Sequence, residues 1–378
     1  MRIYLDHNAT TPVRAEVVEA MAAALRERFG NPSSTHAEGA AARAAVERAR
    51  EQVAELLGAD PRAVTFSSGA TEANNAALRG VLASSGRRHI VTTTVEHPSV
   101  EEPLRALEAE GLSVTRVPVD AEGRLDPEAV AAALQDGTAL LSVILANNET
   151  GVVQDGAKLA ELAHARGVPL HLDATQAVGK LPLDVVALGA DLCSGSAHKL
   201  NGPKGAGFLI DRSRQLPALI QGGPQERRRR GGTENVAGII GLGVACALAR
   251  RELREREQHV AALRDALWRG IEGSVPRVRR NGATAQVLPN TLNVEFEGAA
   301  GEVLLEALDL AGVAVSAGAA CHSGSIEASS VLLAMGRSPA QARGSLRFSL
   351  GPSNTKGEIA RVLELLPGLV SRVREAGA

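Results

Sequence analysis

The sequence is poor in cysteine and in aromatic residues, and it lacks long apolar runs. Its 378 residues include three cysteines, one tryptophan and one tyrosine. Cys193, Cys246 and Cys321 are too few and too scattered for a disulfide framework or a CxxC metal site. No run approaches the roughly 18 apolar residues of a membrane span, and the sequence shows no signal peptide. We therefore expect a protein of the reducing cytoplasm with no membrane attachment.

An excess of charge of one sign is also missing. The chain carries 41 basic and 43 acidic residues, which give a formal net charge of −2. This balance supplies no broad basic field for nucleic acid, so nucleic-acid binding is not predicted. The exception is a run of four arginines at Arg227–Arg230. It is either a solvated loop or a surface that binds an acidic partner.

Short β-branched runs alternate with Ala- and Leu-rich stretches between about residues 60 and 210. This alternation predicts an α/β fold with a doubly wound, mostly parallel sheet. Ligands of such sheets bind beyond the carboxyl ends of the strands, so the loops there should hold the site. Strands are expected at residues 63–66, 89–94, 140–145, 168–172 and 206–210, and helices at 71–82, 98–110, 126–134 and 155–166.

The pattern changes after a long, charged, mainly helical segment at about residues 234–270. Strands expected at 291–296 and 313–315 and a helix at about 356–375 indicate a smaller α+β unit. We predict a large α/β domain over residues 14–255. Residues 1–13 and 256–378 would form the small domain, and the boundary is placed to within about ten residues.

Four polar clusters follow predicted strands, where the site of such a sheet should lie. Ser67–Glu72 joins a strand to a helix and fits either a phosphate cradle or an ordinary helix cap. Asn147 follows the third strand. Asp173 ends the next strand, where it caps a helix or keeps a pyridinium nitrogen protonated. Lys199 lies in a Ser-Ala-His-Lys turn and is a candidate Schiff-base lysine.

Asp173 and Lys199 are 26 residues apart, which leaves room for one helix and one strand between them. Both should therefore open onto the same edge of the sheet. Two strand-end sites that converge on one crevice indicate a shared function more strongly than either motif alone.

The ordered motifs resemble the cysteine desulfurases of the class V aminotransferase group, the NifS and IscS type, nearly end to end. The resemblance implies the type I fold of pyridoxal-phosphate-dependent transferases, with pyridoxal 5′-phosphate as cofactor. It also implies a homodimer that converts L-cysteine to L-alanine. Besides the four clusters, the matching segments are Tyr4–Pro12, Gly30–Ser34, Gln225–Asn235, Ala317–Ser325 and Leu346–Gly351.

The resemblance implies a role for each matching position. Lys199 would bind the cofactor and later move the Cα proton, and His97 would stack on the cofactor ring, with a helix-cap histidine as the alternative. Asn147 and Arg347 would bind the substrate carboxylate. The remaining implied cofactor contacts are Ala70 and Asn147, Asp173 at the pyridine nitrogen, Gln176 at the ring oxygen, Thr71, Ser196 and His198 at the phosphate, and Thr233 at the phosphate of the neighbouring subunit.

Cys321 decides the reaction. It lies in a Gly/Ala/Ser-rich stretch, whereas Cys193 and Cys246 have the apolar neighbours that are typical of inert core cysteines. The resemblance implies that the Cys321 thiolate takes the sulfur of L-cysteine and holds it as a persulfide. Sulfur-acceptor proteins, such as an iron–sulfur scaffold or a tRNA-thiolating enzyme, would then receive it.

The segment around Cys321 departs from the Ser-Gly-Ser-Ala-Cys-Thr-Ser usual in the family. Gly318–Ser323 reads Gly-Ala-Ala-Cys-His-Ser and resembles the selenocysteine lyases, so a lyase that acts on L-selenocysteine is one alternative. The other matches, especially Gln225–Asn235 and Ser323–Met335, favour a desulfurase. Two further alternatives are a cofactor-binding scaffold that relays sulfur, against which the intact Lys199 and Cys321 argue, and a true aminotransferase, which leaves Cys321 unexplained.

Overall fold

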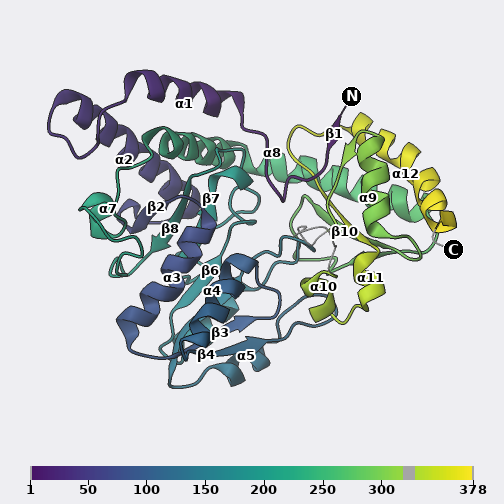
Figure 1. Cartoon of the computed structure of the whole chain (residues 1–378), viewed down its shortest axis with the longest axis horizontal. Helices are drawn as coiled ribbons and strands as arrows, with labels where there is room; N and C mark the ends of the chain where they lie inside the picture. The colour runs from purple at the N-terminus through teal and green to yellow at the C-terminus, as the bar shows by residue number, and fades with distance from the viewer. Residues whose placement is uncertain (1, 318–327, 377–378) are drawn as a thin grey trace.

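A sheet of seven strands, counted over the residues that the computed structural model describes (2–317 and 328–376), forms the centre of the larger part of the chain (Figure 1). β8 runs antiparallel to both of its neighbours, and the other neighbouring pairs are parallel. The prediction of a doubly wound, mostly parallel sheet is confirmed. In spatial order the strands are β2 (Val64–Ser67), β8 (Gly207–Asp211), β7 (Leu192–Ser196), β6 (Leu170–Asp173), β5 (Thr138–Ile144), β3 (His89–Thr93) and β4 (Ser113–Val117).

Helices cover both faces of this sheet, so its central strands are apolar on both sides. All seven residues of β5 are buried. One face packs against α3 (Ala70–Ser85) and α4 (Pro98–Ala109). The other packs against α2 (Ala37–Leu57), α5 (Pro127–Ala133), α6 (Gly156–His164) and the first half of α8 (Val236–Ser274).

The expected strands and helices between residues 60 and 210 are all present, with ends that differ by a few residues. α5 begins as the sequence suggests, because the Asp126 carboxylate accepts the Glu128 N–H and Pro127 occupies the first turn. The interval between Asp173 and Lys199 differs from the prediction. It contains β7 but no α-helix, and residues 174–191, all of them described, form turns and irregular segments.

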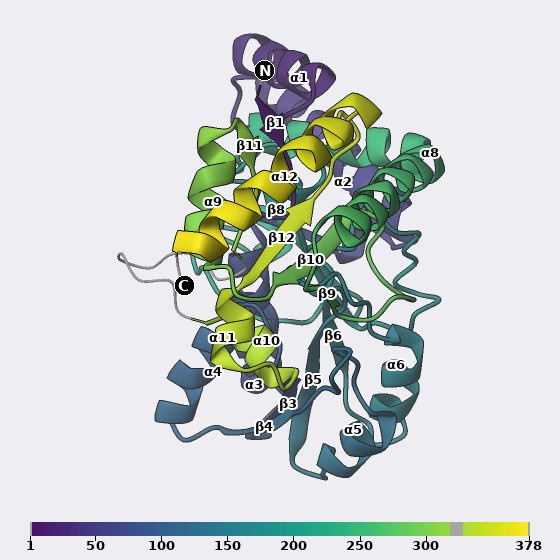
Figure 2. The ribbon, with the colours of Figure 1, turned by 90° about the vertical axis from the view of Figure 1, so that its right-hand side faces the viewer.

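The smaller part is built on an antiparallel sheet in the order β12 (Ser345–Ser349), β10 (Thr291–Phe296) and β9 (Val278–Asn281). Figure 2 shows α8, α9 (Gly301–Leu310) and α12 (Lys356–Ala376) packed around this sheet, where their apolar faces form a second core. β1 (Ile3–Tyr4) pairs in parallel with β11 (Val313–Ala314). The short helices α10 (Ser330–Ala334) and α11 (Pro339–Arg343) lie between the two parts.

α8 connects the two cores. Its 39 residues extend about 58 Å at 1.5 Å per residue, and Figure 1 shows it passing from the larger part into the smaller one. Leu242 and Cys246 belong to the first core, and Leu263 and Leu267 belong to the second. The boundary proposed near residue 255 falls inside this helix, and the division into domains stays a prediction. Within the described ranges, no helix is both long enough and apolar enough to cross a membrane.

The arginine run begins inside a left-handed turn, α7 (Gln225–Arg228). Glu226, Arg227 and Arg228 have φ values of 45°, 57° and 65°, a conformation that costs about 1–2 kcal/mol per residue. The buried Glu226 carboxylate holds the turn, because it accepts two hydrogen bonds from Arg50 (2.7 and 2.8 Å) and one from the Phe66 N–H (2.8 Å).

Three of the four arginines in the run bind the chain's own surface. Arg227 pairs with Glu47 and Arg230 with Glu72, while Arg229 donates to the carbonyl oxygen of Val64. The run is thus largely folded back on the protein. Binding of an acidic partner stays a prediction.

Candidate active site

A cavity of about 700 Å³ lies at the carboxyl ends of β2, β3, β5, β6 and β7. These strands all point the same way, so the loops that follow them meet at one edge of the sheet. Nine residues that the sequence singled out line the cavity: Ala70, Thr71, His97, Asp173, Gln176, Ser196, His198, Lys199 and Arg347.

Lys199 ends the short turn that follows β7. Its Nζ donates hydrogen bonds to the carbonyl oxygens of Asn8 (2.6 Å) and Ala9 (2.9 Å). Burial, and then the charge of Arg347, lower its pKa to about 8, although Asp6 and Asp173 oppose the shift. A large fraction of the amine is therefore neutral at mildly alkaline pH, which is the form that attacks a carbonyl carbon.

Asn8, which the sequence analysis did not assign, joins Lys199 to the smaller part. Its carbonyl oxygen accepts from Lys199 and from Gln176 Nε2 (2.9 Å). Its side-chain oxygen accepts from Lys180 Nζ (3.0 Å) and Asn290 Nδ2 (3.1 Å). All these groups are in or next to the cavity, so one buried asparagine fixes the lysine relative to both parts of the chain.

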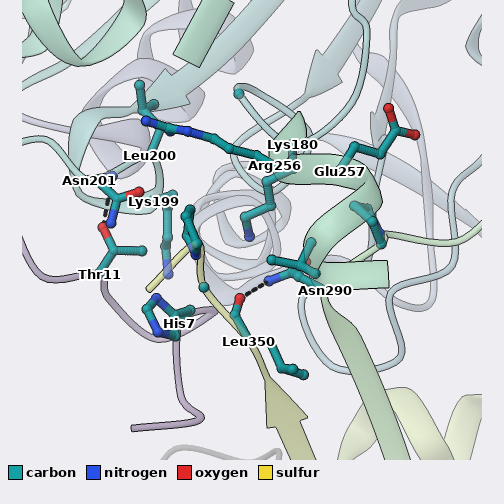
Figure 3. A pocket seen from close by; sticks show the side chains of 15 residues that line it. His7, Thr11, Lys180, Lys199, Leu200, Asn201, Arg256, Glu257, Asn290 and Leu350 are labelled. Carbon is teal, nitrogen blue, oxygen red and sulfur yellow. Dashed lines mark hydrogen bonds between the residues drawn. The ribbon is translucent and has the colours of Figure 1, made fainter. Parts of the chain in front are cut away.

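Lys180 is a second half-buried lysine near the site. Figure 3 shows Lys180, Lys199, His7 and Asn290 around a smaller cavity of about 40 Å³, which shares Lys199 with the larger one. Burial, then the charges of Lys199 and Arg347, hold the pKa of Lys180 well below its ordinary value. Lys180 Nζ donates to Gln176 Oε1 at 2.5 Å, which fixes the orientation of that amide.

Asp173 lies at the end of β6, and its side chain is buried. Oδ1 accepts the Thr175 N–H at 3.0 Å, and Oδ2 accepts from Asn74 Nδ2 at 2.9 Å. These two donors hold the carboxylate in one orientation. Asp173 therefore provides an oriented negative charge in the cavity wall.

His97 both caps a helix and faces the cavity. Its Nδ1 accepts the Ser99 N–H at 3.1 Å at the start of α4, as in the helix-cap interpretation. The same ring lines the cavity. Partial burial of the ring lowers its pKa, an effect that Asp173 opposes and Lys199 reinforces. Stacking on a cofactor stays a prediction.

The segment Ser68–Thr71 leads from β2 into α3 and lines one end of the cavity. α3 begins at Ala70 and has no side-chain cap, so its first N–H groups and its dipole are available to an anion. Gly207 makes this turn possible, because a Cβ there would lie 2.5 Å from the Gly69 Cα. The geometry favours the anion cradle over the ordinary helix cap.

Arg347 reaches the cavity from β12 and is almost fully buried. Its Nη2 pairs with Asp6 Oδ1 at 2.6 Å, and Nη1 donates to the Asn148 carbonyl oxygen at 3.0 Å. Its Nε is buried without a hydrogen-bond partner in the described part of the chain. The guanidinium is thus fixed in position, and its Nε–H remains an unpaired donor among these residues. Asp6 was not assigned a role from the sequence.

Two predicted residues lie elsewhere. The Asn147 side-chain oxygen accepts the N–H groups of Glu149 and Thr150, and its Nδ2 donates to Val95 O, so this amide stabilises its own loop. The neighbouring Asn148 lines the cavity. Thr233 is exposed and outside the cavity. The roles implied for Asn147 and Thr233 stay predictions.

The described cysteines are both buried in the first core. Burial raises the pKa of the Cys246 thiol to about 12 and raises that of Cys193 as well. A raised pKa disfavours the thiolate that a nucleophile needs. Cys321 lies outside the described residues.

The fold and the cavity together define an α/β enzyme whose site combines a reactive lysine, a buried carboxylate, an anion cradle and an oriented arginine. Comparison with known proteins specifies this further. The family model "Aminotransferase class-V" matches residues 3–362, and the chain belongs to this family.

Relatives and solved structures match along nearly the whole chain. A cysteine desulfurase of Cereibacter sphaeroides is 48% identical over 377 residues, which cover 99% of this chain and 97% of that protein. The cysteine desulfurase IscS of Dictyoglomus turgidum is 44% identical over 376 residues, with 98% and 95% covered. A solved structure described as a NifS-like protein has a TM-score of 0.92 at 36% identity and covers 98% of this chain and 100% of its own.

Proposed function

We propose that the protein is a pyridoxal-phosphate-dependent cysteine desulfurase, which converts L-cysteine to L-alanine and holds the sulfur as a persulfide on Cys321. The observation that carries the proposal is the cavity shared by Lys199, with its lowered pKa, the buried carboxylate of Asp173 and the start of α3. The full-length similarity to cysteine desulfurases supports the same reaction.

The residues of the cavity fit the cofactor that the family implies. Its phosphate would bind at the start of α3 beside Ser196 and His198, and its pyridine nitrogen would meet Asp173. Thr175 Oγ1 lines the cavity and is buried without a partner among the described residues, so it has a hydrogen bond to offer. Bound pyridoxal phosphate supplies an electron sink for the electrons released when the substrate Cα loses its proton.

The chain's own groups would then act in turn. Arg347 orients the substrate carboxylate through charge-assisted hydrogen bonds. Lys199, as a neutral amine, takes the Cα proton and later returns one. The Cys321 thiolate attacks the substrate sulfur, so the C–S bond breaks as an S–S bond forms, and the carbon keeps the electron pair. The products are a Cys321 persulfide and, after protonation of that carbon, alanine.

The persulfide would pass to sulfur-acceptor proteins, such as an iron–sulfur scaffold or a tRNA-thiolating enzyme. We also propose a homodimer in the cytoplasm. Thr233 is exposed and does not line the cavity of its own chain, which is compatible with a contact to the phosphate site of a second copy.

One assay distinguishes the proposed desulfurase reaction from the alternative functions. The purified protein, given L-cysteine and a reductant, should release sulfide and alanine in equal amounts. Pyruvate, or transfer of the amino group to an oxo-acid, would indicate an aminotransferase, and no turnover would indicate a sulfur-relay scaffold. Much faster turnover of L-selenocysteine than of L-cysteine would favour the lyase that the Gly318–Ser323 segment suggests.

Replacement of Arg347 by leucine should weaken substrate binding. The change removes the guanidinium and leaves the Asp6 carboxylate unpaired next to the substrate site. Because charge-assisted hydrogen bonds are lost, kcat/KM for L-cysteine should fall about 10- to 100-fold, mainly through KM. Steady-state kinetics measure the change. An unaltered KM would show that another group binds the carboxylate.

Cofactor uptake should depend on pH through Lys199. Only the neutral amine reacts with an aldehyde, and the Lys199 pKa of about 8 lies below the ordinary value for lysine. The rate at which cofactor-free protein takes up pyridoxal phosphate should therefore rise through pH 8 and level off above it. A rate that rises steeply up to pH 10 would indicate an unperturbed lysine.

A further inference from the structure

The wall of the cavity contains a buried polar chain that the proposed mechanism does not use. It consists of Asn74 on α3, Ser99 on α4 and Ser194 on β7, all buried, and it runs between His97 and Asp173. Buried polar groups destabilise a fold unless they are paired, so the direction of each hydrogen bond here is constrained. These directions determine where His97 carries its proton.

His97 Nδ1 faces two groups of Ser99. The backbone N–H lies 3.1 Å from Nδ1 and the hydroxyl oxygen 2.8 Å from it. A backbone N–H can only donate, so Nδ1 must accept and carries no proton. A neutral imidazole with a bare Nδ1 has its proton on Nε2.

The Ser99 hydroxyl is oriented from its other side. Asn74 Nδ2 donates to Ser99 Oγ at 2.9 Å. The oxygen therefore accepts from Asn74, and its own proton is free to point at His97 Nδ1. The imidazole nitrogen thus receives a second donor.

The Asn74 amide has only one satisfactory orientation. Its Nδ2 donates to Asp173 Oδ2 at 2.9 Å as well as to Ser99, and its Oδ1 accepts from the Ser194 hydroxyl. The flipped amide would place Oδ1 against the Asp173 carboxylate. The charge of Asp173 therefore fixes the amide, the amide orients the Ser99 hydroxyl, and the hydroxyl fixes the tautomer of His97.

We propose that Asn74 and Ser99 are positioning residues that hold His97 as the neutral tautomer protonated on Nε2 and link this tautomer to the carboxylate of Asp173. For its catalytic meaning the inference rests on the proposed function. His97 would offer an N–H donor to ligands in the cavity. The ring could accept a proton at Nε2 only as the tautomer that carries its proton on Nδ1. Two donors already point at Nδ1 and disfavour that tautomer, so Lys199 rather than His97 takes the substrate Cα proton.

The charges around His97 agree with a neutral ring. Asp173 favours the protonated imidazolium, but the loss of hydration and the charge of Lys199 outweigh it and lower the pKa of His97. The preceding residue, Glu96, is buried, and its pKa is raised to about 8 by burial, so it adds little negative charge near neutral pH.

NMR of the protein labelled with ¹⁵N-histidine tests the tautomer directly. The spectra are recorded with and without added pyridoxal phosphate, and the His97 signals are assigned by their loss in His97→Gln. Between pH 6 and 8, Nδ1 should show the shift of a bare pyridine-type nitrogen and Nε2 that of a protonated one. A protonated Nδ1 in this range would overturn the proposal.

The Ser99→Ala variant tests the hydroxyl. It removes a donor that stabilises the unprotonated Nδ1, so the pKa of His97 should rise by about 0.5 to 1 unit. Ser99→Thr should restore the original value. Ser142→Ala is the matched control, because it removes a hydroxyl 2.9 Å from Nδ1 of a different histidine, His171, and should leave His97 unchanged. An unchanged His97 pKa in Ser99→Ala would refute the assignment of Ser99.

A double-mutant cycle tests Asn74, with circular dichroism to show that each variant is folded. Asn74→Ala should raise the His97 pKa by less than Ser99→Ala does, and it should add little in the Ser99→Ala background, because Asn74 acts through the hydroxyl. Fully additive shifts would contradict this. These titrations need no turnover, so a failure to release sulfide would refute the proposed function while leaving this result intact.

Discussion

Replacing Lys199 with alanine is expected to lower L-cysteine turnover by about 10³-fold, and to remove the yellow colour that pyridoxal phosphate gives when it is bound to a lysine. Within the described ranges, the other two lysines near the cavity are placed differently. Lys180 is fixed by Gln176 and Asn8, and Lys204, although it lines the cavity, lies in the following loop rather than at the strand end. Absorbance spectra and sulfide release measure the two effects.

The control for this experiment is Lys158→Ala. Lys158 is an exposed lysine on α6 that pairs with Glu161, so its loss should change neither colour nor rate. If Lys199→Ala kept both, the proposed cofactor site would be wrong. The proposed cofactor site would also be wrong if the wild-type protein were colourless and took up no pyridoxal phosphate.

The Cys321→Ala variant should lose turnover of L-cysteine by at least about 10³-fold, because it lacks the nucleophile that receives the sulfur. Selenium leaves carbon more readily than sulfur does, so turnover of L-selenocysteine should be affected less. Alanine and sulfide, or selenide, are quantified with each substrate in turn.

Cys246→Ala is the matched control, because this thiol is buried and its pKa is raised to about 12. It should retain full turnover of both substrates. If Cys321→Ala and wild type turned over L-cysteine equally, the sulfur would have a different acceptor and the persulfide step would be wrong.

Much of the fold followed from the sequence because strand and helix signals there are local. β10 has the predicted ends, and the Asp126-Pro127 start of α5 is as expected. The spacing of Asp173 and Lys199 predicted a strand between them, but its bounds were not predicted because Leu-Cys-Ser-Gly-Ser lacks the β-branched residues that indicate a strand. β6 and β8 pair with the two edges of β7, and all five of its residues are buried. Tertiary packing, not local preference, makes it a strand.

The candidate site was predicted where a residue follows a strand and carries unusual chemistry. Lys199 and Asp173 line one cavity, as their positions at strand ends suggested, and Arg347, which only the resemblance to cysteine desulfurases indicated, lines the same cavity. Asn8 and Asn74 were missed because neither is reactive by itself, and each acts through partners far away in the chain. Asn147 shows another limit of prediction from the sequence. Two asparagines are adjacent here, and the sequence does not indicate which of the two side chains faces the cavity.

The long helix α8 has a consequence for how the enzyme handles its ligands. Both apolar cores pack against the same helix, so a chain cut near residue 255 would leave each fragment with uncovered apolar surface. Rotation of one core relative to the other would require α8 to bend. We therefore expect substrate to enter and product to leave through movement of the loops at the cavity rim rather than through movement of the two cores.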